Sequence, residues 1–182
     1  MDSRIVNKAI KEEIKPVLEK NGFTKFTMRS AWRFTDETID VINFQSFNSY
    51  LAYGVGCTTY SFAINLGVYY KCFEKTPWFS GKEITLPQES QCHNRNRLNK
   101  KLKQSTLFHP YGNYNNKDIS DIWYVLENGS NLHEVIDDAK RAIGEDGLVW
   151  LSNNTDLHYA LKAYQKNAAQ SVSWSEAEMI SA

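Results

Sequence analysis

The spacing of the apolar residues changes twice along this chain, and this change limits the folds that the chain can adopt. Residues 3–21 carry apolar side chains at helical spacing. Residues 30–73 and 119–128 instead contain the β-branched and aromatic runs that are typical of strands. Helical spacing returns from residue 131. This order predicts an α+β fold, in which an antiparallel sheet is flanked by an N-terminal helix and C-terminal helices.

Turn-forming and helix-breaking residues predict where the N-terminal helix and the strands begin and end. In the first helix Pro16 predicts a kink or a second start, and Asn21-Gly22 predicts the end. The segment 48–59 contains Gly54 and Gly56 and is predicted to be a loop. The predicted strands are "SAWRF" (30–34), "DVINFQSF" (40–47), "YSFAINLGVYYKCF" (60–73), a short one within "GKEITLPQ" (81–88), and "ISDIWYVLEN" (119–128).

The C-terminal part is predicted to form three short helices. The first runs over residues 131–143 and is broken by Gly144 and Gly147, and the second covers residues 148–154. The third covers residues 155–167, with Thr155 as its N-cap. We predict a single domain over residues 1–168 and a Ser- and Ala-rich tail over residues 169–182.

The composition of the chain argues for a single globular domain and against several classes of protein. The chain has 182 residues, which fit one domain, and its 21 basic residues balance its 21 acidic ones. Balanced charge argues against a general affinity for nucleic acid or for an anionic membrane. The charged N-terminus is not a secretory signal, and no apolar run reaches the roughly 20 residues that a membrane helix needs. Three cysteines without metal-ligand spacing predict a reduced, cytoplasmic protein that holds no metal or cofactor.

Two predicted strands carry carboxamides opposite their most apolar residues. Asn43 and Gln45 lie on one face of the first strand, and Asn65 and Gly67 lie on one face of the second. If the apolar faces of both strands align, Asn43, Gln45 and Asn65 share one surface. These amides either face solvent or line a concave binding face, where Gly67 would let a ligand approach the backbone.

The segment "CHNRNRL" (92–98) combines a Cys-His pair with two arginines. Adjacent side chains are poorly placed to form a nucleophile–base pair, so we expect Cys92 to pack as an inert, buried residue. In an extended segment His93, Arg95 and Arg97 share one face, and Cys92 lies on the other. Because guanidinium groups suit carboxylates and phosphates, this face is either an anion-binding site or a solvated basic edge that continues into the following lysines.

Six motifs in a fixed order carry a resemblance: "KPVLEKNGF", "VINFQ", "FAINLGVY", "CHNRNRL", "DIWYVLE" and "GLVWL". Together they resemble the bacterial family known as domain of unknown function 4304, over roughly residues 10–165. The insertion at 48–59 and the C-terminal tail depart from it. The family's signature positions hold Asn43, Gln45, Asn65, Gly67, Cys92, His93, Arg95 and Arg97. The resemblance implies no activity, but such families are similar to small proteins of bacterial conflict systems, including immunity proteins that neutralise toxins.

Three classes of function follow from these residues. Our expectation is a non-catalytic binding module, such as an immunity-type protein, which binds a protein partner. The predicted binding residues are Asn43, Gln45, Asn65, Gly67, His93, Arg95 and Arg97. The alternative is a small enzyme for a phosphate- or carboxylate-bearing substrate or nucleic acid, with His93 as acid/base and Arg95 and Arg97 holding the anion. Direct nucleic-acid binding through "RNRLNKKLK" (95–103) is disfavoured by the balanced charge. A small anionic ligand of a non-catalytic protein stays open.

Overall fold

The structure is a computed structural model, and it describes residues 3–72, 84–108, 119–156 and 158. Within these residues five strands form one antiparallel sheet in the order β1-β2-β3-β4-β5. The strands are β1 (Phe23–Phe26), β2 (Ser30–Phe34), β3 (Thr38–Ser46), β4 (Phe62–Tyr70) and β5 (Asn94–Arg97). The α-helices are α1 (Ser3–Ala9), α2 (Lys15–Lys20), α3 (Ser49–Val55), α4 (Leu132–Ala142) and α5 (Leu148–Thr155). The predicted α+β class is confirmed.

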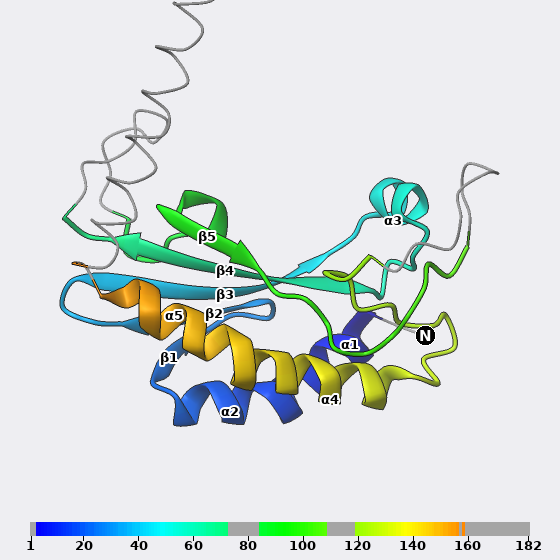
Figure 1. Cartoon of the computed structure of the whole chain (residues 1–182). Helices are drawn as coiled ribbons and strands as arrows, with labels where there is room; N and C mark the ends of the chain where they lie inside the picture. Colours follow the sequence, from blue (N-terminus) through cyan, green and yellow to red (C-terminus); the bar gives the residue numbers. More distant parts are fainter. Residues whose placement is uncertain (1–2, 73–83, 109–118, 157, 159–182) are drawn as a thin grey trace, which may run out of the picture.

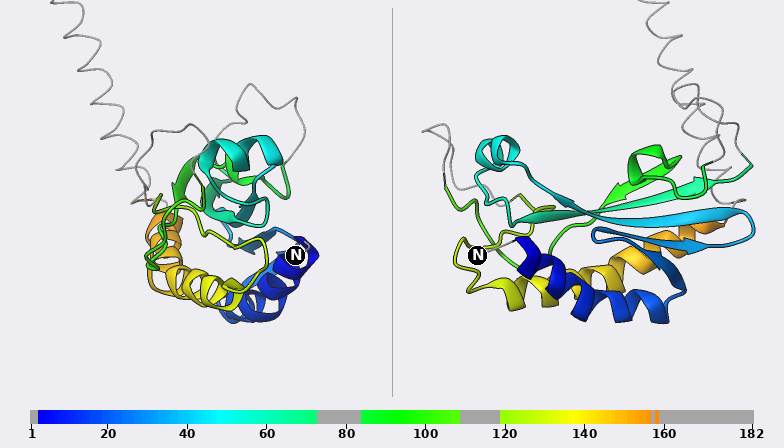
Figure 2. Two further views of the ribbon diagram at one scale, coloured as in Figure 1. Left: turned by 90° about the vertical axis from the view of Figure 1, so that its right-hand side faces the viewer. Right: turned by 180° about the vertical axis from the view of Figure 1, so that it is seen from behind.

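The sheet separates two layers (Figure 1). Helices α1, α2, α4 and α5 cover one side, which we call the inner face. Helix α3 and the 3₁₀ turn η2 (Glu89–Gln91) stand over the opposite side, the outer face, as the further views also show (Figure 2). The main core fills the inner face, where Ile42, Ile64 and Leu66 of the sheet are buried together with Ile14, Leu18 and Ile136 of the helices.

The N-terminal helix contains a π-helical turn, η1 (Ile10–Ile14), between α1 and α2. Pro16 follows this turn and lies in the first turn of α2, and it has no N–H to donate to the preceding helical turn. The helix ends at Lys20, and Gly22 adopts a left-handed φ of 85°. The predicted helix at 3–21 is therefore confirmed, and the irregularity expected at Pro16 is a π-helical turn that precedes it.

The predicted strands at 30–34, 40–47 and 60–73 correspond to β2, β3 and β4, although β4 ends at Tyr70. Strand β1 was not predicted. The predicted short strand at 81–88 is wrong for residues 84–88, and residues 81–83 lie outside the described part.

The predicted final strand at 119–128 is also wrong, because it makes one isolated bridge, between Trp123 and Phe62. Side chains take up the backbone N–H groups of the three residues that follow Trp123. Gln104 Oε1 accepts from Tyr124, Ser61 Oγ accepts from Val125, and Asn131 Oδ1 accepts from Leu126.

The predicted loop at 48–59 is corrected, since α3 occupies its first half. The side-chain oxygen of Asn48 accepts a hydrogen bond from the Leu51 N–H at 2.8 Å, which caps the helix. Gly56 ends it with a left-handed φ of 75°. Gly56 thus marks the end of a short helix, and Gly54 is tolerated inside it.

The predicted break at Gly144 and Gly147 is wrong as well. A π-helical turn, η3 (Ile143–Gly147), joins α4 to α5 without interruption. A Cβ at Gly147 would lie 3.1 Å from Leu98 Cδ1, so this glycine allows close packing on the segment after β5. Thr155 is the last residue of α5 rather than an N-cap. Residues 159–182, which include most of the third predicted helix and the tail, lie outside the described residues.

None of the helices in the described part of the chain has the length and apolar character needed to cross a bilayer.

A buried carboxylate ties α5 to the sheet. Asp40 of β3 is fully buried, and its Oδ2 lies 2.8 Å from Arg33 Nε and 2.7 Å from Arg33 Nη2. Thr155 Oγ1 lies 3.1 Å from Asp40 Oδ1. Burial raises the pKa of the Asp40 carboxyl, and the charge and hydrogen bond of Arg33 oppose this effect.

We expect Asp40→Ala to lower the free energy of unfolding by about 3 kcal/mol, because Arg33 would keep a largely buried charge without its carboxylate. Thr155→Val removes the hydroxyl, which contacts both Asp40 and the Leu151 carbonyl, and is expected to cost about 1 kcal/mol. Urea denaturation of both variants measures the two losses. Equal losses in the two variants would contradict the Arg33–Asp40 ion pair as the main interaction of this carboxylate.

Candidate functional site

The three carboxamides predicted to share a surface lie together on the outer face. Asn43 of β3 is directly opposite Asn65 of β4 in the sheet register. Asn65 Nδ2 donates to Gln45 Oε1 at 3.0 Å and lies 3.5 Å from Asn43 Oδ1. Asn43 Nδ2 in turn donates to Ser30 Oγ of β2 at 3.0 Å. The expectation that these side chains share one face is confirmed.

Arg97 of β5 joins the carboxamides to a carboxylate. Its Nε donates to Asn65 Oδ1 at 2.9 Å, and its Nη2 donates to Gln45 Oε1 at 2.5 Å. Its Nη1 lies 2.9 Å from Asp121 Oδ2. We call the connected set Ser30, Asn43, Gln45, Asn65, Arg97 and Asp121 the polar network. Sequence reasoning missed Asp121, because nothing in the spacing relates it to a strand edge that precedes it by more than twenty residues.

Two apolar clusters flank the polar network on the outer face. Along β4, the outward side chains pass from Ala63 in the first cluster through Asn65 to Tyr69 in the second. The first cluster lies with α3 and consists of Phe47, Ala52, Cys57, Ala63, Ile122 and Tyr124. The second lies with η2 and consists of Trp32, Ile39, Val41, Tyr69 and Cys92. The amides are therefore held in place between apolar packing on both sides.

Arg95 makes a separate ion pair. Its Nε lies 2.6 Å from Glu89 Oε1, and just over half of its side chain is exposed. Each arginine of "CHNRNRL" thus has a carboxylate of the same chain beside it, Glu89 for Arg95 and Asp121 for Arg97. These carboxylates compensate the two positive charges, so an external anion is not required for that purpose.

His93 lies directly before β5, and its ring points to the backbone of the neighbouring strand β4. Its Nδ1 accepts a hydrogen bond from the Tyr70 N–H at 3.1 Å, and its ring centroid lies 4.8 Å from that of Tyr69. Burial lowers the pKa of His93, which favours the neutral ring that this hydrogen bond needs. His93, Arg95 and Arg97 therefore bond to three different groups, and the structure does not bring them together around one ligand position.

Cys92 lies directly over Gly67. A Cβ at Gly67 would come within 2.5 Å of Cys92 Sγ, so the glycine makes room for this cysteine. The space above Gly67, which the binding-face alternative assigns to a ligand, is filled by the chain itself. Cys92 also lies on the outer face with Tyr69, not on the side opposite Arg95, because regular alternation begins only at Asn94, after η2. Burial raises the pKa of the Cys92 thiol far above its ordinary value, and the Glu89 carboxylate adds to this effect.

A hollow of about 420 Å³ borders the polar network. Ser30 and Asn43 line it from the sheet, and Gln88 and Glu89 line it from the η2 segment. Trp32 also lines it, and its Nε1 donates to the Pro87 carbonyl at 2.8 Å. The hollow is small, and a carboxylate that is already paired with Arg95 stands at its side.

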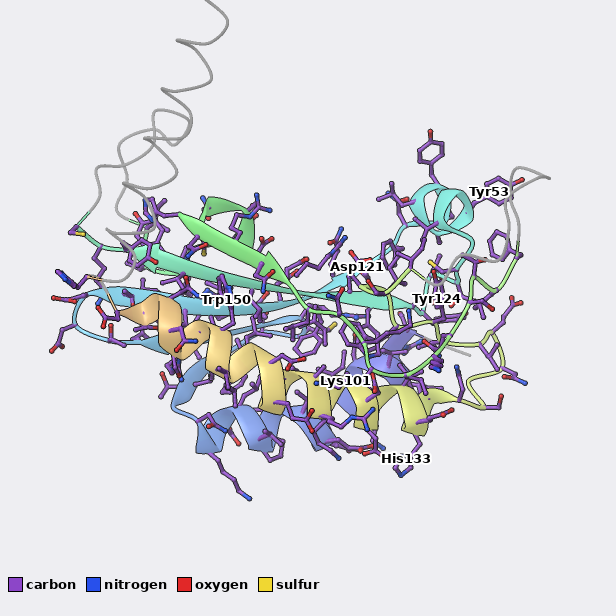
Figure 3. The ribbon with its side chains drawn as sticks, viewed as in Figure 1. Tyr53, Lys101, Asp121, Tyr124, His133 and Trp150 are labelled. Carbon is purple, nitrogen blue, oxygen red and sulfur yellow. The ribbon has the colours of Figure 1, made fainter. Side chains whose placement is uncertain are left out.

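An exposed aromatic cluster lies on α3 and was missed by sequence reasoning. Tyr50 is 81% exposed and Tyr53 is 53% exposed, and the Tyr53 ring lies 5.8 Å from that of Phe108. Leu51 adds further exposed apolar surface. We call these four residues the α3 patch, and Figure 3 marks Tyr53 in it. The patch was missed because residues 48–59 were predicted to be a loop. Two tyrosines three residues apart, after Asn48 as a helix cap, could have indicated it.

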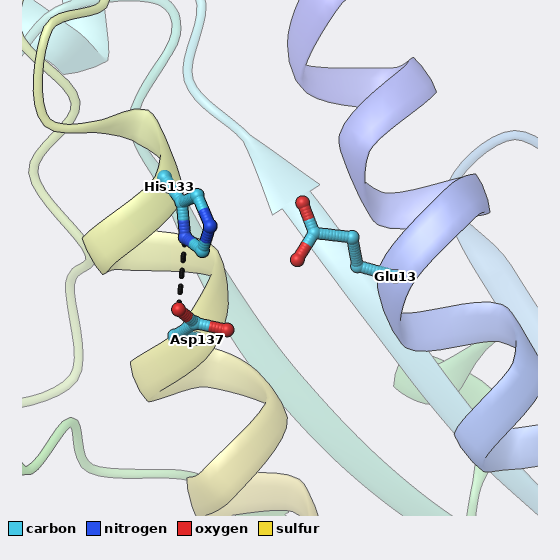
Figure 4. Close-up of side chains that lie close together, drawn as sticks. All are labelled: Glu13, His133 and Asp137. Atoms are coloured by element: carbon cyan, nitrogen blue, oxygen red, sulfur yellow. Dashed lines mark ion pairs between the residues drawn. The ribbon is translucent and has the colours of Figure 1, made fainter.

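One group of possible metal ligands occurs in the described residues, on the inner layer of helices. Glu13 of η1 and His133 and Asp137 of α4 have ligand atoms within 4.8 Å of one another (Figure 4). His133 Nδ1 lies 2.8 Å from Asp137 Oδ2, and Lys140 Nζ lies 2.8 Å from Asp137 Oδ1 and 3.7 Å from Glu13 Oε2. Lys140 already supplies a cation to both carboxylates, so the group is a surface ion-pair network that links the two helices.

We expect native thiol titration at pH 8 to modify Cys72 rapidly, because it is exposed, and to leave Cys57 and Cys92 unmodified, because they are buried. Burial raises the pKa of Cys57 to about 11, so its reactive thiolate is scarce at this pH. The matched control is Cys72→Ser, which should show no rapid phase. Fast modification of Cys92 in that variant would overturn its assignment as an inert packing residue.

We expect Gly67→Ala to destabilise the fold by about 2 kcal/mol, because the added methyl group overlaps Cys92 Sγ. Cys92→Gly in the same chain should recover part of this loss, which a double-mutant cycle of unfolding free energies measures. If the two losses simply add, Gly67 is not required by contact with Cys92.

The comparisons with known proteins give one match. The family model described as "Domain of unknown function (DUF4304)" matches residues 14–153. No curated protein and no solved structure matches the chain. The family model covers well over half of the sequence and spans the whole sheet, the polar network and the α3 patch. This chain belongs to the DUF4304 family.

Proposed function

We propose that this chain is a non-catalytic binding module that covers the surface of a protein partner, in the manner of an immunity-type protein of a bacterial conflict system. The observation that carries the proposal is the α3 patch, where Tyr50, Leu51, Tyr53 and Phe108 are exposed on the same side of the sheet as the polar network. Tyrosine is enriched at protein interfaces because its ring supplies apolar contact area and its hydroxyl keeps a polar contact.

The composition of α3 supports this use. The helix sequence "SYLAYGV" contains no charged residue, as is typical of the centre of an interface. Beneath it, Ala52 packs on the buried first cluster, which holds the short helix against the sheet. A patch that is already ordered before binding loses little conformational entropy when the partner arrives.

The polar network supplies the surface beside the patch. Gln45 and Asn43 are half-buried, and Arg97 is partly exposed, so their outer edges are available for contact. Their hydrogen bonds to one another hold the donors and acceptors at fixed positions. Such a surface gives specificity, because a partner that cannot match these groups leaves them without hydrogen bonds.

The chemistry of the "CHNRNRL" segment supports binding over catalysis. The Cys92 thiol is buried, His93 Nδ1 is engaged by the Tyr70 N–H, and Arg95 is paired with Glu89. A catalytic site needs a nucleophile or base that can reach a substrate, and these three groups are directed to other parts of the chain. The assignment to a conflict system rests on the resemblance of such families to immunity proteins.

The test uses affinity capture with the full chain and a matched set of variants. The wild-type protein should retain a stoichiometric protein partner from a lysate of its source organism. Tyr50→Ser with Tyr53→Ser should weaken retention by roughly tenfold or more, because exposed aromatic anchors dominate interface energies. Val149→Ser is the control, since Val149 is similarly exposed on α5, away from the patch.

A second readout addresses the immunity role. Expression of the captured partner alone should arrest growth of a host, and co-expression with this chain should restore it. The double tyrosine variant should fail to restore growth while its melting temperature stays close to that of the wild type. Capture of no stoichiometric partner, or equal capture by the double variant, would contradict the proposal.

A further inference from the structure

A second surface lies on the inner layer, where the N-terminal helix passes the β1–β2 hairpin. A groove of about 750 Å³ runs between them, and its lining residues extend from Arg4 to Leu18 along the helix. At a rise of 1.5 Å per residue, this part of the helix is roughly 20 Å long. The groove is therefore elongated, and it lies on the other side of the sheet from the α3 patch.

The inside of the groove is apolar. Its floor is formed by Ile10 and Ile14 of the helix and by Phe26 and Phe44 of the sheet. Met28 lines it at the hairpin turn and is 68% exposed, and Phe26 is half-buried. Large apolar side chains that stay open to water beside a groove are typical of a binding surface for another apolar face.

Four cations line the same groove at regular intervals. Arg4, Lys8, Lys11 and Lys15 follow one another at spacings of four, three and four residues, so they lie along one side of the helix. Glu12 is the one carboxylate in this lining. From Arg4 to Lys15 the positive charge extends over roughly 16 Å.

The contacts that these lysines already make are weak ones. Lys8 Nζ lies 3.8 Å from Glu12 Oε1, and both side chains are more than 60% exposed. Lys15 Nζ lies 3.3 Å from Glu19 Oε1 and 4.9 Å from the centre of the Phe26 ring. Exposed pairs of this kind contribute little, so carboxylates of a ligand can replace them at small cost.

A polar atom in the groove also lacks a partner. Asn7 lines the groove, and its Oδ1 is buried without a hydrogen bond among the described residues. Its Nδ2 is directed to the sulfur of Met28, at 2.9 Å. A buried amide oxygen without a donor is costly, and rotation of the Asn7 side chain toward the groove would let an N–H or O–H of a ligand relieve that cost.

We propose that this groove binds an acidic amphipathic helix of a protein partner. Apolar side chains of that helix would enter between Ile10, Phe26 and Met28, as in other helix-in-groove complexes. Its carboxylates, at intervals of three and four residues, would face Arg4, Lys8, Lys11 and Lys15. A single-headed anion such as a fatty acid fits less well, because one carboxylate cannot use four cations spread along the groove.

This site does not depend on the α3 patch. The two surfaces lie on opposite faces of the sheet, and their variants share no residue. A negative capture experiment with the tyrosine variants would therefore not bear on the groove proposal. A negative result with the groove variants would likewise not bear on the immunity proposal.

The experiment uses the full chain and fluorescein-labelled helical peptides of about 18 residues, which are roughly 27 Å long. The peptides carry Leu and Ile on one stripe and Glu on its flank, in a panel that steps through spacings of three and four residues. Fluorescence anisotropy measures binding at two salt concentrations. We expect at least one Glu peptide to bind, with an affinity that falls as salt rises. The same peptide with Lys in place of Glu should bind roughly tenfold more weakly or not at all.

The variants decide whether the peptide sits in the groove. Lys8→Glu with Lys11→Glu should weaken binding roughly tenfold or more, and Met28→Asp should weaken it as well. Lys103→Glu is the matched control, because it reverses an exposed lysine that does not line the groove. Circular dichroism and the melting temperature verify that each variant is folded.

Several results would overturn the proposal. These are no binding by any Glu peptide, equal binding to all variants, and equal binding by the Glu and Lys peptides. Tighter binding of laurate than of any peptide, lost in the same variants, would assign the groove to an acyl anion instead. Displacement of the bound Glu peptide by a synthetic peptide of residues 169–182 would assign it to the chain's own C-terminal segment.

Discussion

Strands β3 and β4 pair without interruption from Thr38 opposite Tyr70 to Ser46 opposite Phe62. Every residue of β4 is buried, so this pair is covered on both faces. Its register puts Ile42, Ile64 and Leu66 into the inner core, and a shift by one residue would turn them outward. The helical layer, the polar network and the two outer clusters all take their positions from this one register.

The outer face shows how a buried polar surface is tolerated. Asn65 is only 8% exposed, which would be costly if its amide lacked partners. The side chain donates to Gln45 and accepts from Arg97, so both ends of the amide are satisfied. Arginine suits this position because its planar group holds three donor nitrogens apart in a fixed geometry and directs them to three separate acceptors, whereas all the donors of lysine lie on one nitrogen.

The two proposed binding surfaces differ in chemistry. The α3 patch is aromatic and uncharged, and it adjoins a network of amides. The groove along the N-terminal helix is lined by four cations around an apolar floor. A chain with no net charge therefore carries a local positive strip, and the overall balance of charged residues conceals it. The two surfaces would recognise different parts of a partner, or different partners.

The sequence by itself determined the elements whose apolar period is long and unbroken. The N-terminal helix and strands β2, β3 and β4 follow from it, and so does the shared face of Asn43, Gln45 and Asn65, because alternation in a strand is a local property. Short elements were not predictable in this way. Strand β1 and helix α3 are brief, and they form because they pack on the rest of the sheet.

Only the tertiary structure decided the roles of the charged and reactive residues. Whether Arg97 would bind an external anion depended on Asp121, which reaches it from a segment after β5. The role of Gly67 depended on Cys92, whose sulfur fills the space above it. Whether residues 119–128 would pair as a strand depended on Gln104, Ser61 and Asn131, which bond to that backbone instead. Each outcome rests on a contact between segments distant in the chain, and the periodicity of one segment carries no information about the side chain that another will place beside it.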